Sequence, residues 1–186
     1  MEGVRLVEEA LAAGVEVAYI LYAPDLTDRP RGADLLRAAS ARGVPLHRVT
    51  PEALERAADT QSPQGVVGVF RPRTRTLDDL GPGLVVVLDN LQDPGNLGTV
   101  IRTLEALGGG GAVVAGGVDP FNPKVVRGAM GSLFRLPVVK LGLDVALRGL
   151  RAEGRRIYVA DAGGALAPWE AQLARAAVVI GNEGAG

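Results

Sequence analysis

The chain has 186 residues, 47% of them hydrophobic, and a formal net charge of −1 at pH 7. It has no cysteine, which excludes disulfides and thiolate metal sites, and its single histidine argues against a histidine metal site or a Ser-His-Asp triad. No apolar stretch reaches the roughly 18 residues of a membrane helix, and no basic-then-apolar leader opens the chain. We therefore expect a cytoplasmic protein without a metal or a membrane segment.

Residues 1–70 alternate between helical and β-rich patterns, which predicts a small α/β domain. Apolar residues at helical spacing in 4–12 indicate a helix, and the β-rich stretch 15–22 indicates a strand. Thr50 directly before Pro51 has the pattern of an N-cap followed by the first helical residue. The further predicted elements are a helix at 34–41, a strand at 44–49, a helix at 51–58 and a strand at 65–70.

Residues 71–83 change in character. Their sequence, RPRTRTLDDLGPG, holds two Pro, two Gly and three Arg but few apolar residues. We interpret this segment as a linker, because complete α/β patterns lie on both sides of it. The alternative is a long surface loop inside one domain.

Residues 84–186 alternate strictly between strand and helix, which predicts a parallel sheet with helices on both faces. The expected strands are 84–88, 112–115, 138–141, 156–160 and 176–180. The expected helices are 96–107, 122–133, 144–153 and a short one around Trp169. The run Gly108 to Gly111 follows a helix and precedes a strand, so it indicates a helix end and not a nucleotide-binding loop.

Two polar loops follow strands of this second unit. In LDNLQDPGNLGTVIRT the apolar run stops at Asp89, turn formers follow, and Asn96 lies near the start of a helix that carries Arg102. In VVIGNEGAG the last strand runs into a Gly-rich loop with Glu183. Because ligands gather at the carboxyl ends of parallel strands, we expect both loops to share one site. For Asn96 the alternative is a helix cap. For Arg102 it is a surface helix charge, and for the loop with Glu183 it is an ordinary Gly-rich turn.

Together, in this order and spacing, the two loops resemble the first and second signature motifs of the SpoU-TrmH family of RNA ribose 2′-O-methyltransferases. The stretch NPKVVRGAMGSLFRLPV between them is also similar to that family. Upstream, Glu2-Gly3, Glu9-Ala10-Leu11 and Gln64-Gly65-Val66-Val67 resemble the family's extra N-terminal RNA-binding domain, which has a ribosomal-protein-like α/β fold. The resemblance therefore covers nearly the whole chain.

The resemblance implies an α/β knot, in which the C-terminal chain threads through a loop, and a homodimer with active sites near the subunit interface. It implies S-adenosylmethionine as the cofactor, held by backbone of the knot loops. The implied cofactor-binding residues are Ile180, Gly181, Asn182 and Gly184. By motif position, the implied catalytic residues are Asn96, Arg102 and Glu183.

The chemistry of the implied reaction constrains the role of Arg102. The family assigns the base role to the matching arginine, but a guanidinium has no lone pair to accept a proton. We instead expect Arg102 to grip the phosphate beside the target ribose and to stabilise the developing alkoxide. Asn96 would orient Arg102 or the hydroxyl, and Glu183 would position either of the two by hydrogen bonding.

One segment of the second unit has basic side chains but no acidic ones. Residues 120–143 contain no Asp or Glu. We expect three cations there, Lys124, Arg127 and Arg135, to hold RNA by its phosphates. The alternative, of equal weight, is that these three residues are ordinary charges on a helix surface or a loop.

One departure from the family concerns the chain ends. The family's third motif, a Leu-rich tail that makes the knot and part of the cofactor pocket, is missing here, and the N-terminus begins late. We therefore expect a chain clipped at both ends, without its knot segment, whose 186 residues alone lack a complete cofactor site. The N-terminal domain favours rRNA over tRNA as the substrate. Two other classes stay open: a non-catalytic RNA-binding protein of this fold and a small-molecule α/β enzyme.

Overall fold

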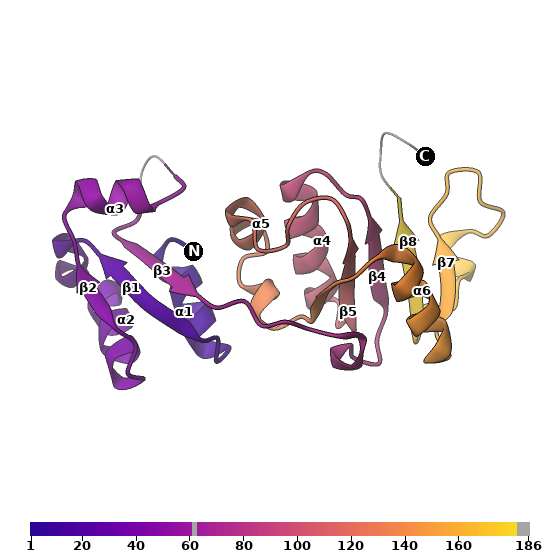
Figure 1. The fold of residues 1–186 in the computed structure, drawn as a ribbon, viewed down its shortest axis with the longest axis horizontal. Helices are drawn as coiled ribbons and strands as arrows, with labels where there is room; N and C mark the ends of the chain where they lie inside the picture. Colours follow the sequence, from indigo (N-terminus) through magenta and orange to yellow (C-terminus); the bar gives the residue numbers. More distant parts are fainter. Residues whose placement is uncertain (61–62, 182–186) are drawn as a thin grey trace. The chain divides into compact units, whose positions relative to one another are not determined.

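The computed structural model describes residues 1–60 and 63–181. The chain divides into two compact units, Met1–Arg73 and Thr74–Gly186 (Figure 1). This division falls inside the segment predicted as a linker. The part after it belongs to the second unit, because Leu77–Asp79 forms a short 3₁₀ helix, η2, and Leu77 and Leu80 pack against the core of that unit.

The first unit is a three-stranded sheet with helices around it. Its strands are β1 (Val17–Tyr22), β2 (Leu46–Arg48) and β3 (Val66–Phe70), and its helices are α1 (Val4–Ala12), α2 (Pro30–Ala41) and α3 (Pro51–Ala57). The strand order is β2-β1-β3, with β2 parallel and β3 antiparallel to β1. The predicted cap of α3 is confirmed, since Thr50 Oγ1 accepts a hydrogen bond from Ala53 N at 3.3 Å.

Helix α2 begins one turn earlier than the sequence predicted. Pro30 stands in its first turn, where a missing N–H costs nothing. Gly32 also lies in this turn, and a side chain at its position would meet the Leu26 carbonyl oxygen at 2.3 Å. Glycine is therefore needed for packing against the preceding 3₁₀ turn, and tertiary contact overrides its low helix propensity.

The second unit is a five-stranded parallel sheet with the order β6-β5-β4-β8-β7 (Figure 1). Its strands are β4 (Val85–Asp89), β5 (Gly111–Ala115), β6 (Val138–Lys140), β7 (Arg156–Val159) and β8 (Ala176–Ile180). Its helices are α4 (Pro94–Ala106), α5 (Pro123–Gly128) and α6 (Leu143–Ala152), with 3₁₀ helices η3 (Ser132–Phe134) and η4 (Pro168–Glu170). The predicted parallel α/β architecture is thereby confirmed.

Helices cover both faces of this sheet. Ala146 and Leu150 of α6 cluster with Val85 and Val87 of β4 on one face. Side chains alternate along a strand, so Val86 and Leu88 point to the opposite face, where they are also buried. There α4 presents its own buried side, formed by Leu97, Ile101 and Leu104.

The predicted helix 122–133 is wrong in its second half. Helix α5 ends at Gly128, and Met130 and Gly131 both adopt positive φ, 50° and 90°. A short 3₁₀ helix, η3, then carries the chain toward β6. The apolar spacing continues through the break, which is why periodicity alone missed it.

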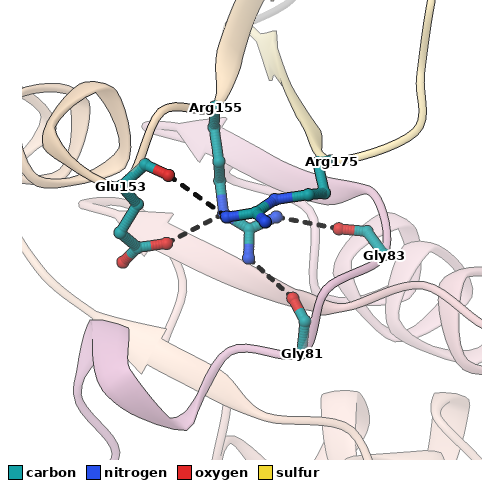
Figure 2. A network of polar contacts seen from close by, with 5 residues as sticks. All are labelled: Gly81, Gly83, Glu153, Arg155 and Arg175. Carbon is teal, nitrogen blue, oxygen red and sulfur yellow. Dashed lines mark hydrogen bonds and ion pairs between the residues drawn. The ribbon is translucent and has the colours of Figure 1, made fainter.

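A buried arginine ties together the amino ends of two strands. Arg155 precedes β7, and its side chain is only 4% exposed. Its guanidinium donates to Gly81 O at 2.6 Å, to Gly83 O at 2.9 Å and to Glu153 Oε2 at 2.9 Å (Figure 2). The two glycines precede β4, so this network closes the amino edge of the sheet. The loop after β4 and the end of β8 lie at the opposite edge.

Candidate active site

The two signature loops leave adjacent strands at the same edge of the sheet. Strand β8 pairs in parallel with β4, and Ile180 lies opposite Leu88. The segment after Leu88 and the segment after Ile180 therefore start side by side at the carboxyl edge. A Cβ added at Gly181 would touch nothing within 4 Å, so there is room for a ligand beside the main chain.

The loop after β4 is shaped by its own polar groups. Asn90 adopts a φ of 55°, donates its backbone N–H to Ala115 O at 2.9 Å and accepts from Gln92 Nε2 at 2.8 Å. The loop after β5 packs against it, because Val118 N donates to Leu91 O at 2.8 Å. These contacts fix the entry into α4.

Asn96 is not the cap of α4. The cap is Asp93, whose carboxylate oxygen accepts a hydrogen bond from Asn96 N at 2.7 Å. Asn96 stands in the first turn of the helix, and its side chain is exposed. The capping alternative raised by the sequence is therefore wrong, and a role for the Asn96 amide must be sought in contacts beyond the helix end.

Arg102 lies on the face of α4 that meets α5. Gly98, four residues earlier, lies on that face, and a Cβ there would approach Gly128 Cα to 3.0 Å. The two helices therefore pack backbone against backbone (Figure 1). Just beyond this crossing, Arg102 Nη1 donates to Met130 Sδ at 3.0 Å. The Arg102 side chain is exposed.

Glu183, Asn182 and Gly184 lie outside the described residues. Their roles, and the expected approach of Glu183 to Asn96 or Arg102, stay predictions. Ile180, half-buried at the end of β8, and the exposed Gly181 occupy the carboxyl edge, as a cofactor-binding role requires.

The cations of residues 120–143 differ in their surroundings. Arg135 Nε donates to Glu105 Oε1 at 2.9 Å, and Ser132 Oγ donates to Glu105 Oε2 at 3.2 Å. The guanidinium lowers the pKa of the Glu105 carboxyl. Lys124 is exposed on α5, and Arg127 is half-buried at the end of the same helix. The segment has no acid of its own, but in the folded unit Glu105 of α4 lies against it.

Sequence reasoning missed three residues that shape this site. Gly98 and Glu105 flank Arg102 on α4, and Met130 contacts it from the loop after α5. Gly98 carried a visible signal, since a glycine inside a helical pattern often marks close packing. Within the described residues, no group of three or more His, Asp or Glu side chains is arranged to hold a metal ion. No helix among them is long and apolar enough to cross a membrane.

Comparison with known protein families gives two matches that together span the chain. Residues 83–186 match the model of the SpoU rRNA Methylase family. Residues 1–76 match a model described as RNA 2'-O ribose methyltransferase substrate binding. The first match alone covers more than half of the chain.

Individual relatives are similar along the whole of this chain, which spans about seven-tenths of their own length. The chain is 36% identical to the 23S rRNA (guanosine(2553)-2'-O)-methyltransferase RlmP of Bacillus subtilis, an alignment that covers 100% of this chain and 72% of that protein. It superimposes on an rRNA methyltransferase from Sinorhizobium meliloti with a TM-score of 0.85 and 29% identity, covering 100% and 71% of the two chains. For the SpoU methyltransferase AviRb from Streptomyces viridochromogenes, in complex with the cofactor AdoMet, the TM-score is 0.83 at 30% identity, with 100% and 73% covered.

Proposed function

Because the chain belongs to the SpoU rRNA methylase family, we propose that it transfers a methyl group from S-adenosylmethionine to a ribose 2′-hydroxyl of RNA, with rRNA favoured as the substrate. The observation that carries the proposal is the register of Leu88 with Ile180, which starts both signature loops side by side. Two loops from separate parts of the sequence can then surround one ligand at the edge where parallel sheets bind ligands.

The cofactor fits the open carboxyl edge at Ile180 and Gly181. Backbone groups at this edge can approach a ligand closely, because Gly181 has no side chain and open space lies beside it. S-adenosylmethionine, when bound, supplies the electrophilic methyl group. What the chain itself must provide is the orientation of the ribose oxygen and the stabilisation of its charge.

Arg102 is the residue suited to the substrate's negative charge. The 2′-hydroxyl loses its proton to water as its oxygen attacks the methyl carbon and the bond from that carbon to sulfur breaks, so negative charge develops on the attacking oxygen. An exposed guanidinium can donate to the neighbouring phosphate and stabilise this charge, while it cannot take the proton. Asn96, exposed in the first turn of the same helix, would orient the hydroxyl or Arg102, and Glu183 would position one of them.

Further parts of the proposal concern RNA and assembly. The first unit, which matches the substrate-binding model, would hold the RNA, with Lys124 and Arg127 contributing phosphate contacts in the second unit. The relatives' names favour rRNA over tRNA. A knotted C-terminal segment, a homodimer formed through the second unit and a cytoplasmic location complete the proposal.

Methyl transfer can be tested with the purified protein. After incubation with S-adenosylmethionine and rRNA or tRNA, nucleoside mass spectrometry should show a new 2′-O-methylnucleoside in rRNA. Arg102→Ala should abolish this product and leave RNA binding nearly intact, since only one phosphate contact is lost.

The matched control is Arg148→Ala, which removes an exposed arginine from α6 on the other face of the sheet. It should leave methylation unchanged. RNA binding without methylation in the parent protein would favour the non-catalytic alternative, and a product in tRNA alone would correct the substrate.

A further inference from the structure

Met130 has an unusual conformation and exposure for a methionine. Its φ of 50° lies in the left-handed region, which residues other than Gly and Asn rarely adopt. The residue is 47% exposed, although methionine ordinarily fills cores. Strained residues of this kind cluster at functional sites and persist where the surrounding structure fixes them.

The thioether of Met130 contacts the residue proposed to meet the RNA phosphate. Arg102 Nη1 donates to its sulfur at 3.0 Å. A thioether is a weak, uncharged acceptor, so it orients the guanidinium without neutralising it. The other four donors of the guanidinium fork lie outside this contact, and a phosphate can displace the sulfur at little cost.

The neighbouring carboxylate that would compete for Arg102 is already engaged. Glu105 stands three residues further along α4, a spacing at which an arginine and a glutamate readily pair. Its two oxygens instead accept from Arg135 and Ser132. The segment after α5 therefore binds the Glu105 carboxylate through Ser132 and Arg135, and it places the Met130 sulfur beside Arg102.

The loop that carries Met130 is anchored to α4 on both sides. Gly98 and Gly128 allow close backbone packing before it, and the contacts of Glu105 hold η3 after it. Within the loop, Met130 N donates to Arg127 O at 3.0 Å. The strained backbone is therefore set by packing around it, and the thioether has a fixed place relative to Arg102.

We propose that Met130 is a positioning residue, whose thioether holds the Arg102 guanidinium ready for the RNA phosphate and releases it when the phosphate binds. The catalytic part of this inference rests on the proposed methyl transfer. The contact itself does not, so it can be tested separately.

Methionine-methyl NMR tests the contact. The 186-residue chain has two methionines, Met1 and Met130, so a sample labelled with ¹³C at the methionine methyl gives two signals. The signal lost in Met130→Leu belongs to Met130. It should shift in Arg102→Ala and stay in place in the control Arg148→Ala. An unshifted Met130 signal in a folded Arg102→Ala sample would overturn the proposal.

Steady-state kinetics of methyl transfer by the purified protein test the function of the contact. Met130→Leu keeps the volume but removes the acceptor, and should lower kcat/KM about tenfold, since small misplacements of a catalytic group are costly. Met130→Gln, which restores a long side chain with an acceptor, should recover part of this loss. Met130→Gly suits the left-handed backbone, so it should lower activity without lowering Tm.

The outcomes separate the two proposals. Full activity in Met130→Leu, or a loss of activity that follows a loss of Tm in all three variants, would overturn the positioning role. A parent protein that does not methylate RNA would refute the proposed function, while the NMR result would still decide whether Met130 holds Arg102.

Discussion

Replacing Arg155 by Met should strongly destabilise the second unit. The substitution keeps an apolar stem of similar length but removes the guanidinium, which is 4% exposed and donates to the carbonyls of Gly81 and Gly83. Hydrogen bonds from a charged group contribute about 1.5–3 kcal/mol each, so the two carbonyls account for about 3–6 kcal/mol. The contact with Glu153, whose side chain is 32% exposed, adds little.

We therefore expect the free energy of unfolding of the second unit to fall by about 3–5 kcal/mol, a large part of the roughly 5–15 kcal/mol of an ordinary domain. Urea unfolding followed by circular dichroism measures this loss. The fluorescence of the one tryptophan, Trp169, is a poor probe, because this residue is 87% exposed. Hydrogen exchange at the amides of β4 and β7 localises the effect, with protection expected to drop about 10²–10⁴-fold.

Arg148→Met is the matched control, because this arginine is exposed on α6. Its effect should stay within about 0.5 kcal/mol. A loss below about 1 kcal/mol in Arg155→Met would refute the reasoning, since it would mean that the two carbonyls exchange the guanidinium for water without penalty.

Two further predictions concern the packing of α4 against the loop after α5. Gly98→Ala places a Cβ 3.0 Å from Gly128 Cα, so it should lower the free energy of unfolding in urea by about 1–3 kcal/mol. It should also slow methyl transfer by displacing Met130. Stability and rate equal to those of the parent protein would contradict the close packing. Arg135 lowers the pKa of the Glu105 carboxyl from its ordinary 4.5, so this pair stabilises the fold above pH 4.5 and the stabilisation is lost as the pH falls through the lowered value. Arg135→Met should reduce the stability lost on acidification below pH 4.5, and an unchanged acid dependence would show that the pair is not linked to folding.

The sequence predicted elements whose signal is local. The apolar run of β4 stops at Asp89, and the turn formers after it correctly marked a loop at the carboxyl edge. The start of α4 was misplaced by two residues, because Asn96 resembles a cap and the true cap, Asp93, was assigned to the turn. Boundaries are decided by single hydrogen bonds, which patterns of hydrophobicity do not contain.

What the sequence could not predict depends on residues far apart in the chain. Arg135 pairs with a carboxylate 30 residues away, which places an acid within an apparently basic segment. Arg155 has the pattern of a solvated charge after a helix, yet it is buried beside two carbonyls more than 70 residues earlier. Such contacts follow from how the helices and strands cross, and that is a property of the assembled sheet.

The position of β8 has a consequence for synthesis of the protein on the ribosome. Strand β8 is the last strand in the described part of the chain, yet it pairs between β4 and β7. A nascent chain that has reached β7 has no partner for that strand, and one side of β4 stays open. The site can therefore form only once β8 has emerged and inserted, so incomplete chains present an unpaired strand edge, where aggregation is favoured, and no assembled catalytic edge.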